Sequence, residues 1–159
     1  MFLFVFFFLA STSVIMGILH QEIKVAEPCE YTRVYSDAEG ESHFENVRIP
    51  FKLADFAPPA PPISVSDSIN TKALVLISSP SGWFGDWHPT PTRQCIILIS
   101  GELEVEVSDG EIRRFKKGDI ALLEDTTGKG HVTRVVSEER AYCIAITLGS
   151  SQDLETEKM

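Results

Sequence analysis

Hydrophobic and polar positions alternate along this chain in short stretches that tight turns separate. Between Glu102 and Val107 every second residue is apolar, and the residues between them are glutamates. Such alternation predicts a β-strand with one face toward a core and the other toward solvent. The dipeptide Asp109-Gly110 follows and predicts a two-residue hairpin, because both residues tolerate the positive φ of a type I′ turn.

Other stretches have the length and composition of strands as well. Lys72–Ser79 and Arg93–Ile99 are apolar on both faces, which is typical of buried strands. Further strands are expected at Tyr31–Tyr35, Glu41–Ile49, Ile112–Phe115, Ile120–Leu123, His131–Val136 and Tyr142–Leu148. A bulge or irregular edge is expected in the second of these, because Phe44 is out of period with Val47 and Ile49. No helix of normal length has an amphipathic period, so the pattern predicts an all-β sandwich or closed barrel.

A cluster of four prolines lies between residues 58 and 62. We expect this segment to run extended along the surface, because proline excludes helix and central strand. It is expected to connect parts of one domain, since the part before it is too short to fold alone. The prediction is therefore a single domain over residues 20–150, followed by a frayed polar tail at 151–159.

Residues 1–19 form a hydrophobic N-terminal segment without a charged side chain. Three interpretations are open. A signal peptide would send the product into the secretory pathway, although no Lys or Arg precedes the apolar run. The segment could also be a membrane anchor, because its length is close to the roughly 20 residues of a helix that spans a bilayer. Only in this case would the protein bind a membrane. Translation from Met16 would leave the protein cytoplasmic.

Composition limits the classes of partner. Hydrophobic residues make up 43% of the chain and charged residues 23%, which is enough apolar material for a globular core. The net charge of −9 argues against nucleic acid, which requires a basic surface. The three cysteines have no metal-finger spacing, and we expect Cys95 and Cys143 to be buried thiols rather than part of a disulfide framework.

Several motifs together resemble a known family. They are Gly101-Glu102-Leu103-Glu104-Val105, the turns Asp109-Gly110 and Gly118-Asp119, and the segments 40–44, 86–88 and 124–131. With these motifs the chain resembles the cupin superfamily, and within it the small single-domain cupin-domain proteins of unassigned activity. The resemblance covers about residues 31–148. It implies a cupin-type double-stranded β-helix, which is an RmlC-like jelly-roll barrel.

The resemblance also implies a metal site. Metal-binding cupins carry His-x-His, a Glu and a Gly in one motif, and a further His in a second motif. When this chain is aligned on that Gly, the positions of the metal ligands are occupied by His88, Thr90, Gln94 and His131. The implied cofactor is a divalent iron, manganese or zinc ion held by His88, Gln94 and His131.

The departures from that motif leave an alternative open. Such ions prefer three or four imidazole or carboxylate ligands, and Gln94 is neutral. A firm site would need Asp125, Glu124 or His43 to reach the ion as well. Otherwise His88 and His131 are hydrogen-bonded polar residues in a metal-free barrel mouth.

Candidate ligand-binding residues follow from the same alignment. The cupin pattern turns Gln94 inward, and strand alternation gives Ile96 and Leu98 the same face as an apolar floor. Asp125 and Thr127 are expected at the rim, with local loop capping as the alternative. Trp87, beside His88, either contacts the ligand or packs in the core or in a lid. The candidate substrate-binding residues are Trp87, Ile96, Leu98, Asp125 and Thr127.

These features favour two functions. The first is a cupin that binds a small organic ligand in its barrel and acts as a metal-dependent oxygenase, isomerase or lyase. The alternative is a non-catalytic ligand-binding cupin without metal. A protein-interaction module would instead need an exposed apolar sheet face. The resemblance further implies a homodimer.

Overall fold

The computed structural model describes residues 23–149, and the regular structure there consists of strands alone. The prediction of an all-β chain is therefore confirmed. The predictions for residues 1–19 and 151–159 lie outside the described residues. No helix in this part of the chain has the length and apolar character that crossing a membrane requires.

Twelve strands follow one another in these residues. They are β1 (Cys29–Ser36), β2 (Ser42–Ile49), β3 (Lys52–Ala54), β4 (Ile63–Val65), β5 (Thr71–Ser79), β6 (Phe84–His88), β7 (Gln94–Ser100), β8 (Leu103–Val107), β9 (Ile112–Phe115), β10 (Ile120–Glu124), β11 (His131–Val135) and β12 (Ala141–Leu148). The predicted strands are all present. The short strands β3, β4 and β6 carry too few residues for a periodic signal.

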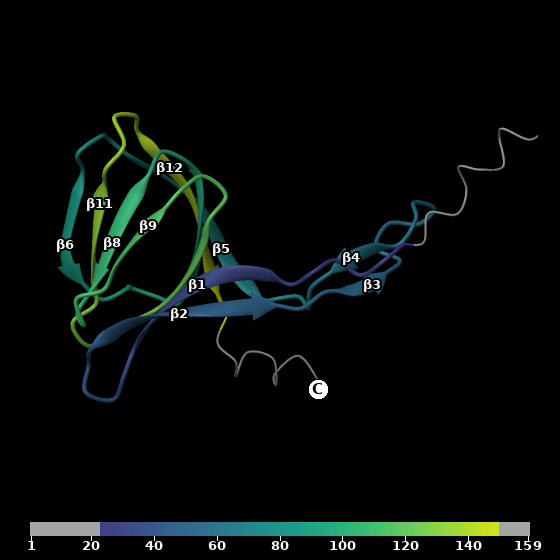
Figure 1. The fold of residues 1–159 in the computed structure, drawn as a ribbon, viewed down its shortest axis with the longest axis horizontal. Coiled ribbons are helices and arrows are strands. Elements are labelled where there is room, and N and C mark those ends of the chain that lie inside the picture. Colours follow the sequence, from purple (N-terminus) through teal and green to yellow (C-terminus); the bar gives the residue numbers. More distant parts are fainter. Residues whose placement is uncertain (1–22, 150–159) are drawn as a thin grey trace, which may run out of the picture. The chain divides into compact units, whose positions relative to one another are not determined.

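The eight strands β5 to β12 form a jelly roll. Four of them follow the order β5-β12-β7-β10 in a six-stranded sheet, and the other four form a second sheet with the order β6-β11-β8-β9. The chain passes repeatedly from one sheet to the other, and every neighbouring pair in these two runs is antiparallel. This topology is a double-stranded β-helix, so the predicted fold class is confirmed. The two sheets face each other (Figure 1).

The first two strands extend the six-stranded sheet. β1 pairs in parallel with β10, and β2 pairs with β1 along its whole length without a register shift. The bulge expected in this strand is therefore absent. Phe44 faces the core and is 8% exposed, while Val47 lies on the opposite face, so the two residues obey one regular alternation.

The core fills the space between the two sheets. Val105 and Val107 are buried, as their alternation with glutamates predicts, and the ring of Phe44 lies 6.3 Å from that of Phe115. The hairpin after β8 has a three-residue loop instead of the predicted type I′ turn. The Val107 N–H donates to the Glu111 carbonyl, and Gly110 adopts a φ of 93°. A left-handed glycine at this position is typical of three-residue hairpin loops.

The described chain divides into two compact units. Residues 27–50 and 66–149 contain the barrel, and residues 23–26 and 51–65 contain the hairpin β3–β4. In the hairpin unit the Ala26 N–H donates to Ser64 Oγ. The four prolines lie in the exposed connection between β3 and β4. The single domain over residues 20–150 stays a prediction.

Candidate functional site

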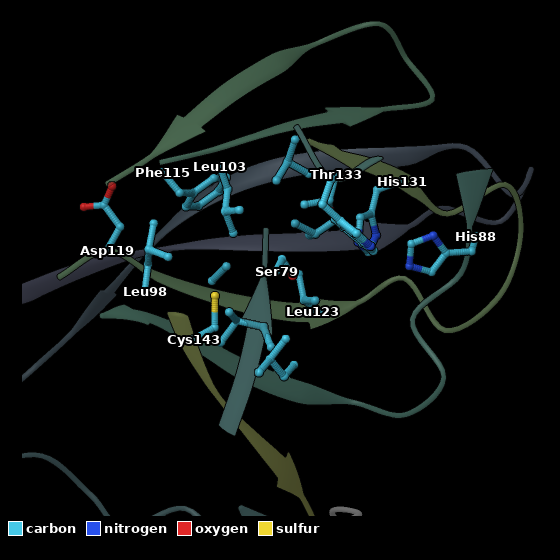
Figure 2. A pocket seen from close by; sticks show the side chains of 16 residues that line it. Ser79, His88, Leu98, Leu103, Phe115, Asp119, Leu123, His131, Thr133 and Cys143 are labelled. Atoms are coloured by element: carbon cyan, nitrogen blue, oxygen red, sulfur yellow. The ribbon is translucent and has the colours of Figure 1, made fainter. Parts of the chain in front are cut away.

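A cavity of about 150 Å³ opens between the two sheets of the barrel. Its wall is mainly apolar and includes Val34, Ile77, Ile96, Leu98, Val105 and Leu123. His88 and His131 lie at one end and Asp119 at the other (Figure 2). An apolar cavity of this volume has room for a molecule of roughly the size of benzene.

The two histidines meet because their strands pair. His88 ends β6, His131 begins β11, and the two residues lie opposite each other in the antiparallel register. Opposed residues of such a pair project from the same face of the sheet. The centroids of the two imidazole rings are 5.0 Å apart, with 49° between the ring planes. The barrel therefore brings together two of the three residues predicted to hold a metal.

A buried carboxylate holds His131. The Nδ1 atom of His131 lies 2.6 Å from Oδ2 of Asp125, a residue that is 0% exposed. The other carboxylate oxygen accepts a hydrogen bond of 2.6 Å from Thr90 Oγ1, and the Thr90 N–H donates to the Asp125 carbonyl. An ionised carboxylate only accepts hydrogen bonds, so Nδ1 of His131 donates, and in the neutral form of the ring the lone pair is on Nε2.

A backbone carbonyl orients His88 in the same way. Its Nδ1 atom lies 2.6 Å from the carbonyl oxygen of Asp86. A carbonyl oxygen is an acceptor, so Nδ1–H of His88 donates, and in the neutral form of the ring the lone pair is again on Nε2. Two imidazoles, each with its Nδ1 atom engaged by an acceptor, therefore line one end of an apolar cavity.

Glycines fix the loop between Asp125 and His131. Gly130 has a φ of +70°, and a Cβ atom there would lie 2.0 Å from the carbonyl oxygen of His88. The carbonyl of Gly130 accepts a 2.6 Å hydrogen bond from Ser42 Oγ, which is fully buried. A Cβ on Gly128 would lie 2.4 Å from the Gly40 carbonyl oxygen. The close approach of Gly130 to the backbone of His88, which sets the distance between the two histidines, thus requires glycine.

The predicted ligand-binding residues take different places. Ile96 and Leu98 line the cavity. Asp125 lies behind His131 and contacts it, so it is neither at the rim nor only a loop cap. Trp87 neighbours His88 in β6 and is 45% exposed, on the opposite side of the strand. Thr127 is exposed, and its carbonyl accepts a hydrogen bond from Ser36 Oγ.

Gln94 begins β7 and shares its inward face with Ile96 and Leu98 by alternation. It is half-buried and does not belong to the cavity lining described above. The cavity lining therefore gives no contact that would place Gln94 beside His88 or His131. Its assignment as a metal ligand stays a prediction.

Two residues of the site have roles that were not predicted from the sequence. Trp83 lines the cavity, although it precedes β6 and only its closeness to Trp87 and His88 in sequence hints at this. Thr90 is 1% exposed and supports Asp125. It follows β6 in an irregular segment, where no periodic pattern reveals which side chains are buried.

Within the described residues the barrel brings two candidate metal ligands together, His88 and His131. Among residues 23–149 no group of three or more His, Cys, Asp or Glu side chains is placed to hold a metal ion. Both oxygens of Asp125 are engaged, and the imidazole nitrogens supply two donors. Iron, manganese and zinc usually take at least three protein ligands, so a further donor would have to come from elsewhere.

The other candidate ligands are engaged elsewhere. Glu124 bridges Arg33 and Arg93, and although burial opposes ionisation, the two guanidinium groups hold the pKa of the Glu124 carboxyl below its usual value. His43 lies between two aspartates, 3.0 Å from Asp37 Oδ2 and 2.7 Å from Asp109 Oδ2. Neither side chain is free to reach the histidine pair.

Cys143 is the thiol of the cavity wall. It is 7% exposed, and burial raises its pKa above the ordinary value. The thiol is therefore uncharged near neutral pH and is a poor nucleophile. The expectation of a buried thiol is therefore confirmed for Cys143, whereas Cys95 is only half-buried.

No protein-family model matches this chain. Among curated proteins, the chain is similar to the oryzines biosynthesis cluster protein J of Aspergillus oryzae. The two are 48% identical over 40 residues, which make up 25% of this chain and 22% of that protein. The chain thus matches about a fifth of the length of this relative.

Three solved structures illustrate the structural likeness. One is an uncharacterized conserved protein with a double-stranded β-helix domain from Klebsiella pneumoniae, with a TM-score of 0.42 and 25% identity over 55% of this chain and 76% of that chain. The Cnp3 cupin domain of Schizosaccharomyces pombe has a TM-score of 0.45 and 14% identity over 84% and 90%. The DMSP lyase DddQ of Ruegeria pomeroyi has a TM-score of 0.43 and 19% identity over 64% and 48%.

These TM-scores are all below 0.5, so the assignment of the fold rests on the strand order of this chain. That order is β5-β12-β7-β10 facing β6-β11-β8-β9. The chain is a cupin-type double-stranded β-helix, and the resemblance stated from its sequence is confirmed at the level of the fold.

Proposed function

We propose that this protein binds a small, mainly apolar organic molecule in its barrel and that His131 exchanges a proton with that molecule. The observation that carries the proposal is the buried chain of hydrogen bonds from Thr90 through Asp125 to His131. An isolated buried carboxylate is costly, and here both oxygens are satisfied by partners that orient one imidazole toward a cavity. The reaction classes that begin with such a proton transfer include isomerisation and elimination.

The chain's own residues define the proton transfer. Neutral His131 accepts a proton at Nε2 from a C–H or O–H group of the ligand, and the bonding electrons stay with the ligand. Asp125 stabilises the imidazolium ion that forms, because it accepts a hydrogen bond from the Nδ1–H. His88 offers a second acceptor nitrogen close by, which receives a hydrogen bond from the ligand or from protonated His131. The proton returns from His131 Nε2 to the product.

The cavity limits the ligand. Its volume of about 150 Å³ and its apolar wall favour a molecule of few atoms with one hydrogen-bond donor for the histidine end. The cavity-lining carboxylate, Asp119, lies at the opposite end (Figure 2). The partial likeness to a protein named after a biosynthesis cluster supports an organic metabolite as the ligand.

Two small probes test this proposal. Phenol and benzene have nearly the same shape, and only phenol donates a hydrogen bond to an imidazole Nε2. We expect the full chain to bind phenol more tightly than benzene, with chemical-shift changes at cavity residues. In His131→Gln the preference for phenol should fall by about fivefold to tenfold, which corresponds to one lost hydrogen bond.

The control variant is His43→Gln, whose imidazole also contacts a carboxylate but lies outside the cavity. It should keep the preference for phenol. Failure of both probes to shift cavity resonances would refute ligand binding in the barrel. An unchanged preference in His131→Gln would refute the role of His131 and leave a non-catalytic ligand-binding barrel.

A divalent metal is the second candidate, and one observation favours it. Imidazoles that bind metals usually donate their other N–H to a carboxylate or a carbonyl, as His131 and His88 do here. His88, His131 and Gln94 would then hold iron, manganese or zinc, which would act as a Lewis acid toward the ligand. Zn²⁺, Mn²⁺ and Fe²⁺ titrated separately should raise the melting temperature of the wild type but not of His88→Ala. No response to any of the three ions would refute this candidate.

A further inference from the structure

One flank of the cavity lies where the edges of the two sheets meet. Among the described strands, β5 forms one edge of the six-stranded sheet, β6 forms one edge of the four-stranded sheet, and residues 80–83 connect them directly. Ile77 and Ser79 from β5 and Trp83 from the connection line the cavity here. Ile77 and Trp83 are each 40% exposed, so their side chains border the cavity on one side and solvent on the other.

A bulge in β6 turns Trp83 toward the cavity and Trp87 away from it. Gly85 and His88, three positions apart, lie opposite residues of β11 that are two positions apart. Both therefore face inward, and Trp83, two residues before Gly85, shares their face. Without the bulge the two tryptophans would lie on the same face, because an even number of positions separates them. Trp83 accordingly lines the cavity and Trp87 does not, although both are described residues.

Gly85 leaves the space in which the indole ring of Trp83 lies. A Cβ atom on Gly85 would lie 2.5 Å from Cη2 and 3.0 Å from Cζ3 of that ring, so the ring packs directly on the backbone of β6. The backbone of Trp83 is held as well, because its N–H donates to the Pro80 carbonyl and its carbonyl accepts from the Val135 N–H. The indole ring therefore has a defined place in the cavity wall although it is partly exposed.

An indole ring at this place favours one class of ligand. Aromatic rings attract one another in offset-stacked and edge-to-face arrangements, and this attraction adds to the effect of burying apolar surface. The cavity wall also contains Phe115, but this residue is 6% exposed and its ring already packs near that of Phe44. Trp83 is therefore the aromatic side chain of the apolar wall that has surface left for a ligand.

We propose that Trp83 determines the specificity of the barrel and selects planar aromatic molecules that carry a hydroxyl group. The hydroxyl group meets the histidine end of the cavity, and the aromatic ring packs against the indole at the flank between β5 and β6. A cavity of about 150 Å³ admits one six-membered ring. This specificity presupposes the ligand binding proposed above, and it adds the class of ligand, which is a phenol-type molecule.

Phenol and cyclohexanol test the specificity, because both carry one hydroxyl group on a six-membered ring and only phenol is aromatic. Phenol is also the stronger hydrogen-bond donor, so the informative quantity is the change in preference between two proteins. We expect the full chain to bind phenol more tightly in chemical-shift titrations. In Trp83→Leu, which keeps an apolar side chain without an aromatic ring, the preference should fall by about threefold to tenfold. Trp83→Phe should retain most of it.

The matched control is Phe84→Leu. Phe84 follows Trp83 directly and is 53% exposed, but it does not line the cavity, and the guanidinium carbon of Arg134 lies 5.4 Å from the centre of its ring. This variant should keep the preference of the wild type for phenol. An equal loss of preference in Phe84→Leu and Trp83→Leu would overturn the proposal, because a general loosening of the connection between β5 and β6 would then explain both.

Fluorescence tests the contact without a change at Trp83. The chain has two tryptophans, so Trp87→Phe leaves Trp83 as the single indole. Phenol should change the emission of this variant and leave that of Trp83→Phe, in which Trp87 remains, unchanged. The proposal is overturned if phenol binds while Trp83→Leu keeps the preference, or if bound phenol leaves the emission of Trp83 unchanged. In both cases ligand binding in the barrel would stand, whereas a failure of phenol to bind would refute both proposals.

Discussion

Burial of the Asp125 carboxylate predicts a large effect of its removal. Asp125→Asn keeps the shape of the side chain and abolishes the charge that two donors now face, Thr90 Oγ1 and His131 Nδ1. Hydrogen bonds to charged groups contribute about 1.5–3 kcal/mol each, and asparagine can replace one acceptor of the two. We therefore expect the free energy of unfolding to fall by about 2–4 kcal/mol.

A second Asp–His contact of the same kind offers an internal control. Asp109 Oδ2 lies 2.7 Å from Nδ1 of His43, close to the 2.6 Å between Asp125 and His131. The difference is exposure, because the Asp109 side chain is 30% exposed and the Asp125 side chain is 0% exposed. Solvent screens the exposed pair, so Asp109→Asn should cost less than about 1 kcal/mol.

Urea denaturation measures both variants. For each, the midpoint should change without a change in the slope of the unfolding free energy. Equal losses in the two variants, or a loss below about 0.5 kcal/mol for Asp125→Asn, would refute the argument that burial makes this contact strong.

Three further predictions concern the loop, the core and pH. Gly130→Ala should lower the free energy of unfolding by more than about 2 kcal/mol, because the new Cβ would lie 2.0 Å from the His88 carbonyl oxygen at a φ of +70°. Thermal unfolding checks this. The control is Gly110→Ala, whose Cβ would meet no atom within 4 Å. Leu98 is 2% exposed, so Leu98→Ala should lower the free energy of unfolding by about 2–4 kcal/mol and enlarge the cavity. The variant should then bind a larger aromatic probe, such as naphthalene, more tightly than the wild type does. Hydrogen bonds that His43 donates to Asp37 and to Asp109 raise the pKa of its imidazole. The stabilisation from these contacts is fully present below the ordinary pKa of 6.5 and is lost as the pH rises through the raised pKa of the folded state. His43→Gln should remove this pH dependence of stability, and an unchanged profile would contradict the reasoning.

The strands could be predicted because their signal is local. The alternation from Glu102 to Val107 and the apolar run from Lys72 to Ser79 each mark one strand, although the burial expected for Lys72–Ser79 was wrong. The turn at Asp109-Gly110 was located correctly but given the wrong loop length, because the same glycine serves two-residue and three-residue hairpins. In β2 a regular alternation that places Phe44 on one face and Val47 and Ile49 on the other resembles an irregular strand.

The site depends on contacts that no local pattern reports. His88 and His131 were identified through the spacing of a motif, and their meeting requires the pairing of β6 with β11. The burial of Thr90 and Asp125 depends on a loop held by Ser42 and by glycines from distant segments. Exposure of β5 was also unpredictable, because an apolar run reads as buried until its place at the sheet edge is known.

One departure of this chain from the metal motif of cupins, Thr90, is connected through Asp125 to a histidine that the motif retains. Thr90 occupies the second histidine place, and its hydroxyl donates to Asp125, so it supports a carboxylate instead of offering a ligand atom. Asp125 in turn orients His131, which is the histidine that the second motif retains. Thr90→His would remove the hydroxyl that donates to one buried oxygen of Asp125, and it would place an imidazole ring where the present side chain is 1% exposed. A histidine at position 90 would thus require a compensating change at Asp125, because the two side chains share a buried hydrogen bond.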